Sequence, residues 1–199
     1  MKVRTVLFFG LAILMGGCLP VFSLHGLYSE DSLVLEEKLL GRWTTDPNEP
    51  DDLWQFARAD DMDKTYKLTM CDSDKNKGCF LARLVKLDSR YFLDLYPDQD
   101  AMEIQDPNKV DWPYNYIFMV PTHTFLKVES IVPRIKLKLT EDQRLQQLLD
   151  EEPNAIGYVK VEDRILLTAE TKKLQAFVLK YADDERLFPD EIVLYPKTK

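Results

Sequence analysis

Apolar and polar residues alternate over much of the chain with the two-residue period of β-strands. For example, Tyr66, Leu68 and Met70 are separated by Lys67 and Thr69. A strand with this pattern can bury one face and expose the other. Similar alternation, or a short run of aromatic and β-branched residues, recurs at 52–58, 80–87, 91–96, 114–120, 122–130, 134–139, 159–161, 165–168 and 192–195. Many short strands joined by turn residues predict a mainly β protein, built as a single antiparallel β-barrel or strongly bent sheet.

Three segments depart from this pattern and predict two or three short helices. Residues 32–40 combine apolar positions with cap residues before them and Gly41 after them, as at the two ends of a helix. Residues 141–150 follow Thr140 in a capping-box pattern and place leucines on one face. Residues 170–182 carry one apolar stripe at helical spacing, which we expect to pack on the sheet.

The N-terminus has the three parts of an export signal. A short basic start leads into an apolar run that ends at Met15, and two glycines then precede Cys18. This order is typical of a signal peptide. The four residues 15–18 also resemble the bacterial lipobox. The resemblance implies a diacylglycerol on the sulfur of Cys18, cleavage before it and acylation of the new amine.

The lipobox resemblance divides the chain into a signal peptide (1–17), a lipid-anchored tether (18–30) and one β-rich domain (31–199). Two alternatives stay open. The uncharged stretch 5–24 could be an uncleaved anchor, because about 20 apolar residues span a bilayer, or the protein could be secreted after cleavage elsewhere. We expect an exported protein held by lipid in the cell envelope. Leu19 points, by resemblance to enteric lipoproteins, to the outer membrane facing the periplasm, if the cell has one.

Charge narrows the range of partners. The predicted cleavage removes Lys2 and Arg4, which leaves 24 Lys and Arg against 34 Asp and Glu, a formal charge of −10. This acidic balance argues against nucleic acid as a partner. The expected partners are the membrane, through its lipid anchor, and an unknown small apolar ligand or envelope protein. The sequence predicts no cofactor and no metal.

Two cysteines are left as a pair if Cys18 carries lipid. An exported protein meets an oxidising compartment, where paired cysteines tend to form bridges. Seven residues separate Cys71 from Cys79; six of them are polar or charged, and the last is Gly78, which suits a hairpin turn. The sequence therefore predicts a disulfide between Cys71 and Cys79 across a β-hairpin.

The sequence Gly41-Arg42-Trp43, after a predicted short helix and before the series of strands, resembles the first strand of lipocalin and calycin barrels. The predicted helix at 170–182 and strand at 192–195 are similar to the C-terminal part of those proteins. The resemblance implies that Gly41 and Trp43 plug one end of a barrel that binds a small apolar ligand. Trp43 could equally be an ordinary core tryptophan, and the Thr-Asp-Tyr motif of the family has no convincing counterpart here.

Three functions remain in order of preference. The first is binding of a small apolar ligand inside a barrel. The second is binding of another envelope protein by the long loop 97–113, which contains Trp112 and is followed by Tyr114. The third is hydrolysis with His123 and carboxylates. Because no catalytic motif is present, we expect a protein that is not an enzyme.

Overall fold

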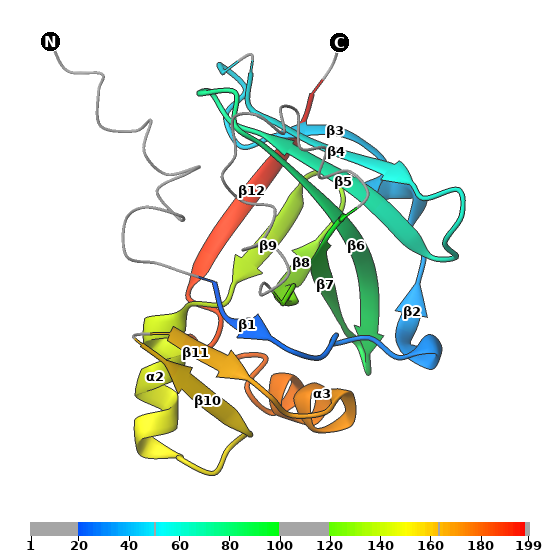
Figure 1. Ribbon diagram of the computed structural model, residues 1–199. Helices are drawn as coiled ribbons and strands as arrows, with labels where there is room; N and C mark the ends of the chain where they lie inside the picture. The colour runs from blue at the N-terminus through cyan, green and yellow to red at the C-terminus, as the bar shows by residue number, and fades with distance from the viewer. Residues whose placement is uncertain (1–19, 50, 100–119, 163, 198–199) are drawn as a thin grey trace, which may run out of the picture.

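The computed structural model describes residues 20–49, 51–99, 120–162 and 164–197. Eight antiparallel strands form a closed barrel (Figure 1), which confirms the predicted mainly β fold. The strands follow chain order around the barrel, and the last one, between β9 and β3, closes it. They are β3 (Gly41–Thr44), β4 (Leu53–Arg58), β5 (Thr65–Cys71), β6 (Lys77–Leu87), β7 (Arg90–Pro97), β8 (Thr124–Ser130), β9 (Ile135–Leu139) and β12 (Asp190–Pro196).

Side chains from alternate strand positions occupy the barrel interior. Trp43 is paired with Trp54, and Phe56 with Leu68, so each pair projects to the same face of the sheet. These residues belong to an interior cluster of buried side chains: Leu39, Trp43, Trp54, Phe56, Tyr66, Leu68, Ala82, Leu84, Leu93, Leu95, Leu126, Val128, Ile135, Leu137, Leu139 and Leu194. Eight strands enclose a space just wide enough for such side chains to fill.

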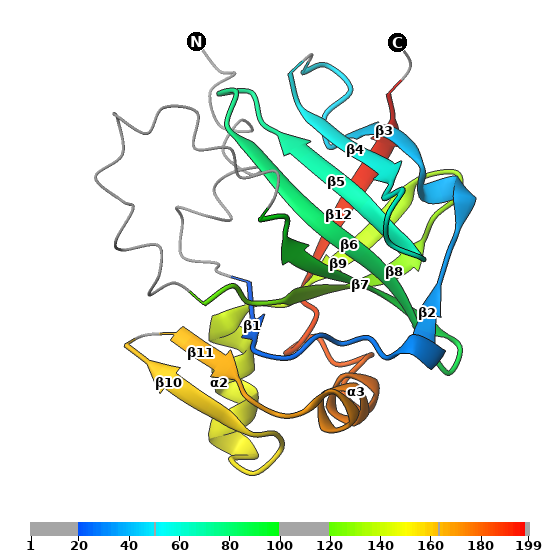
Figure 2. The same ribbon diagram turned by 45° about the vertical axis from the view of Figure 1, so that its right-hand side comes forward.

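A second layer covers one side of the barrel (Figures 1 and 2). It contains α2 (Asp142–Glu151), α3 (Thr171–Lys180) and a three-stranded sheet in the order β1 (Phe22–Ser23), β11 (Arg164–Leu167) and β10 (Tyr158–Val161). The two helices confirm the predictions at 141–150 and 170–182. Their apolar stripes pack in a second cluster with Phe92 and Phe125 from the outside of the barrel, so the domain has two cores that share the barrel wall.

The helix predicted at residues 32–40 is wrong. This segment contains the single turns η1 (Glu30–Ser32) and η2 (Glu37–Leu39) on either side of a short strand, β2 (Leu33–Val34). β2 pairs with Val85 and Leu84 of β6. The backbone therefore finds partners on an existing strand and does not need the internal bonds of a helix.

Residues 20–30 belong to the folded domain, whereas the sequence predicted a tether over 18–30. Val21 and Leu27 are fully buried in the outer cluster. The backbones of Ser23 and His123 exchange two hydrogen bonds of 2.9 and 2.8 Å. From α3, Gln175 donates to the carbonyl oxygen of Leu27 at 2.9 Å. These contacts fix the segment, which we call the N-terminal strap (residues 20–28), across the outside of the barrel.

The predicted disulfide between Cys71 and Cys79 is wrong, because both residues are free thiols. They do lie on neighbouring strands of one hairpin, but Cys71 pairs with Lys77 and Cys79 pairs with Thr69. The two cysteines are thus diagonal neighbours, for which the Cα atoms lie about 7–8 Å apart. A disulfide needs a separation below about 7 Å, so this register does not bring the sulfurs together.

Candidate functional site

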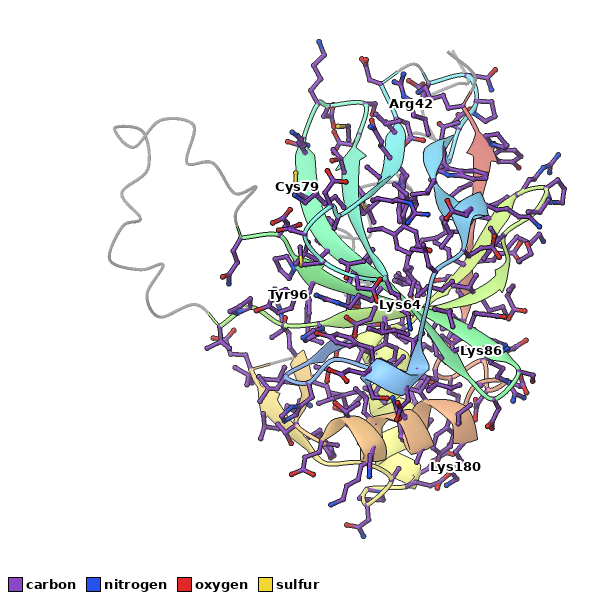
Figure 3. All side chains as sticks on the ribbon, turned by 90° about the vertical axis from the view of Figure 1, so that its right-hand side faces the viewer. Arg42, Lys64, Cys79, Lys86, Tyr96 and Lys180 are labelled. Atoms are coloured by element: carbon purple, nitrogen blue, oxygen red, sulfur yellow. The ribbon has the colours of Figure 1, made fainter. Side chains whose placement is uncertain are left out.

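Trp43 lies inside the barrel, where it is buried and its indole nitrogen donates to the carbonyl oxygen of Leu39 at 3.0 Å. Gly41 is exposed and has a φ of 129°, a backbone conformation that favours glycine. Figure 3 shows Arg42, between them, at the opposite end of the molecule from Lys180 of α3. The hydrogen bond from Trp43 ties η2 to the first barrel strand.

A groove of about 270 Å³ opens where β2 meets the barrel. Leu84, Tyr91 and Val128 from β6, β7 and β8 contribute to its apolar lining. The complete lining is Val34, Leu35, Glu36, Leu84, Tyr91, Val128, Glu129, Ser130 and Ile131. Leu84 and Val128 also belong to the interior cluster, so the groove is a recess in the end of a packed core.

Two carboxylates line this groove and differ in their surroundings. Glu129 receives the ammonium of Lys127 at 2.7 Å, and the same ammonium lies 3.1 Å from Asp183. Glu36 instead caps η2 by accepting the backbone N–H of Lys38 at 3.1 Å. The acid at the β2 side of the groove therefore accepts from a backbone N–H, while the acid at the β8 side is paired with the ammonium of Lys127.

Tyr66 fixes Glu36 from inside the barrel. Its hydroxyl accepts the backbone N–H of Glu36 at 2.7 Å and donates to the carbonyl oxygen of Glu36 at 3.2 Å. Burial raises the pKa of Tyr66 above its ordinary value of 10.0, so the hydroxyl keeps its proton and can donate at neutral pH. The wall of the groove is thus held by a rigid core residue.

His123 lies beside a carboxylate that the sequence analysis did not single out. Its Nδ1 is 2.8 Å from Oδ1 of Asp94, and the side chains are 11% and 0% exposed respectively. The second carboxylate oxygen of Asp94 accepts the backbone N–H of Leu27 at 2.7 Å. The sequence did carry a signal for Asp94, because it is the one charged residue in the run 91–96. The sequence analysis did not foresee that both faces of this strand would be covered.

Aromatic rings flank this pair on the outside of the barrel. The ring of Tyr96 lies 4.6 Å from that of His123, and the ring of Tyr28 lies at 6.1 Å. The guanidinium of Arg83 sits 4.5 Å from the centre of the Tyr28 ring. A carboxylate that orients a histidine is a feature of acid–base catalysis, but here the same carboxylate also holds the N-terminal strap. The geometry makes Asp94 and His123 a clamp for that strap.

Comparison with known proteins finds no matching family model, no matching curated protein and no matching solved structure. Among the residues that the structure describes, no group of three or more His, Cys, Asp and Glu side chains could hold a metal ion. No helix in the same part of the chain is long and apolar enough to cross a membrane.

Three of the predicted site residues lie outside the described residues. They are Cys18, the expected lipid carrier, and Trp112 and Tyr114, the expected interaction residues. The groove at the end of the barrel was missed by sequence reasoning. Its lining comes from β2, β6, β7 and β8, and none of these segments carries a motif that marks it.

Proposed function

We propose that this protein is an exported, lipid-anchored envelope protein that binds a small apolar molecule in the groove at the end of its barrel. The lipobox-like residues 15–18 support the anchor, and the 270 Å³ recess supports the ligand site. Because buried side chains occupy the barrel interior, the ligand site that we propose lies at the end of the barrel and not at its centre. The groove is the observation that carries this proposal.

The size of the groove limits the ligand. Pockets for drug-sized ligands have volumes of about 300–1,000 Å³, so this recess suits a smaller molecule. Apolar side chains such as Val34, Tyr91 and Ile131, which are only partly buried, would contact its body. Glu36 would accept a hydrogen bond from a donor or cationic end group, which favours short amines over acids of the same length.

Binding of two matched probes tests this proposal. We expect 1-hexanol and n-hexylamine both to bind the purified full chain in calorimetry, and hexylamine to bind more tightly because of Glu36. Glu36→Gln keeps an oxygen that can cap η2 but removes the charge. The advantage of hexylamine should then disappear while the affinity for hexanol stays the same.

Filling the groove provides the second arm of the experiment. Ile131→Trp adds bulk to a lining residue and should abolish binding of both probes. Val132→Trp is its matched control, because Val132 is the next residue, is exposed and does not line the groove. If Ile131→Trp binds the probes like the parent, the groove is not their site and the ligand proposal fails.

A further inference from the structure

Exposed apolar side chains gather on the second layer. Among the described residues, the large exposed apolar side chains are Leu24, Val120, Val132, Val159 and Val161. Leu24, Val159 and Val161 belong to or adjoin the three-stranded sheet, and Val120 lies three residues before His123, whose backbone pairs with Ser23 of β1. Only Val132, in the turn between β8 and β9, lies elsewhere in the fold.

Strand register places these residues on one face of the sheet. Phe22 pairs with Leu166, and Leu166 pairs with Val159 on the other side. Val161 lies two positions after Val159 in β10. Leu24 lies two positions after Phe22, just beyond β1, where its backbone N–H still donates to the carbonyl oxygen of Leu167 at 2.9 Å. Both side chains therefore project to the same face. We call the residues Phe22, Leu24, Val159, Val161 and Leu166 the outer sheet face.

The opposite face of this sheet is already covered. Ile165 and Leu167 are buried in the outer cluster with α2 and α3, and the carboxylate of Asp142 at the start of α2 accepts the backbone N–H of Ile165 at 2.9 Å. The helices cannot reach the outer sheet face. Figure 2 shows the β10–β11 hairpin at the edge of the molecule, on the side away from the turn between β8 and β9.

The chain enters the domain at this face. Cys18 is four residues before Phe22, so an extended chain places them no more than about 14 Å apart. The strap is held in place by buried Val21, by the bridge between Pro20 and Glu141 and by the pairing of β1 with β11. A lipid on Cys18 would therefore hold the outer sheet face close to the bilayer.

We propose that the outer sheet face rests on the membrane surface, with Val159 and Val161 inserted at the boundary between the lipid head groups and the acyl chains; this inference rests on the lipid anchor of the proposed function. The occupant is a lipid bilayer, because the anchor lies within reach and the face is apolar. Arg164 is the charged residue that register places on this face, while the mature chain is acidic. Zwitterionic lipids therefore suit the contact better than a strongly anionic surface.

Tryptophan placed on this face can report its contact with lipid. The full lipidated protein, purified in detergent from its own membrane, is inserted into vesicles of phosphatidylcholine brominated on the acyl chains. Val161→Trp and Val159→Trp should each lose the emission of the added tryptophan, relative to vesicles without bromine. Val132→Trp is the matched control, since Val132 is 57% exposed against 55% for Val161, and its emission should persist.

The possible results separate the two proposals. The spectrum of the parent protein is subtracted, and circular dichroism shows that each variant keeps the parent fold. If the protein floats with the vesicles but neither Val159→Trp nor Val161→Trp is quenched, the membrane contact is wrong and the anchor stands. If Cys18→Ser is processed and floats like the parent, the lipid anchor is wrong, and the inference falls with it.

Discussion

At the scale of single residues, Asp94 determines how the N-terminal strap joins the barrel. A buried carboxylate is costly unless its oxygens are hydrogen-bonded, and both oxygens of Asp94 have partners, in His123 and in the backbone of Leu27. The two partners lie far apart in the chain, one in the strap and the other immediately before β8. One side chain of β7 therefore connects the strap with the start of β8.

Replacing Asp94 should destabilise the fold strongly. Asp94→Ala leaves the Leu27 N–H and His123 Nδ1 without their acceptor, and we expect a loss of about 2–4 kcal/mol, since each unsatisfied buried group costs about 1–3 kcal/mol. Asp94→Asn keeps one acceptor and should cost less. Urea unfolding measures both variants. Asp190→Ala, which removes an exposed carboxylate from β12, should stay within about 0.5 kcal/mol of the parent; an equal loss in this control would remove the special role of Asp94.

At the scale of elements, the register of the β5–β6 hairpin decides the state of the thiols. The turn between Cys71 and Cys79 contains Lys75, with a φ of 66°, and Asp72 caps it by accepting from the backbone of Asn76 at 2.8 Å. This turn pairs Cys71 with Lys77, not with Cys79. A side chain's position relative to its neighbour across the hairpin is thus fixed by the turn.

Both thiols should react with an alkylating agent under denaturing conditions without reductant. Mass spectrometry should find Cys71 and Cys79 both modified, because their diagonal placement separates the sulfurs. Thr69→Cys is the matched control, because residue 69 lies directly opposite Cys79. This variant should form a bridge between residues 69 and 79 and protect these two residues from alkylation. A parent protein in which reductant is needed to label Cys71 and Cys79 would contradict the register argument.

At the scale of the whole molecule, folding shifts the pKa values of carboxylates around the second layer in opposite directions. Hydrogen bonds and nearby cations hold the pKa of Asp183, Asp184 and Glu152 below their ordinary values, mainly through Arg90, Arg186 and Tyr181 respectively. Asp142 differs, because burial raises its pKa above 3.8. A lowered pKa stabilises the fold at neutral pH, whereas a raised pKa opposes folding at neutral pH.

The free energy of unfolding should therefore fall as the pH is lowered through the ordinary carboxylate values of 3.8 and 4.5. The groups with lowered pKa lose their stabilising contribution as they become protonated. Asp142 offsets part of this loss, since its unfavourable charge disappears at low pH. In Asp142→Asn, which keeps an oxygen for the Ile165 N–H, the loss between pH 7 and pH 3 should be larger than in the parent. Urea titrations at several pH values test this prediction. An equal or smaller loss in the variant would show that burial does not raise the pKa of Asp142.

Local pattern alone determined which segments form most of the elements. The alternation around Tyr66 to Met70 predicted a strand, and the stripes at 141–150 and 170–182 predicted helices, because these periods depend only on which side of an element is buried. The Gly-x-Trp sequence placed Trp43 on the first barrel strand. The same reasoning failed for the segment 32–40. Its apolar residues suit a helix, but β6 offers a strand partner that no local pattern reveals.

Tertiary structure decided everything that depends on residues far apart in the chain. Asp94 meets Leu27 across 67 positions, the groove collects residues from four strands, and the outer sheet face exists only because β1 joins the hairpin of β10 and β11. Hairpin register likewise separated two cysteines that sequence spacing had paired. Such contacts depend on how strands are ordered and offset around the barrel, and the period of a single strand carries no information about its neighbours.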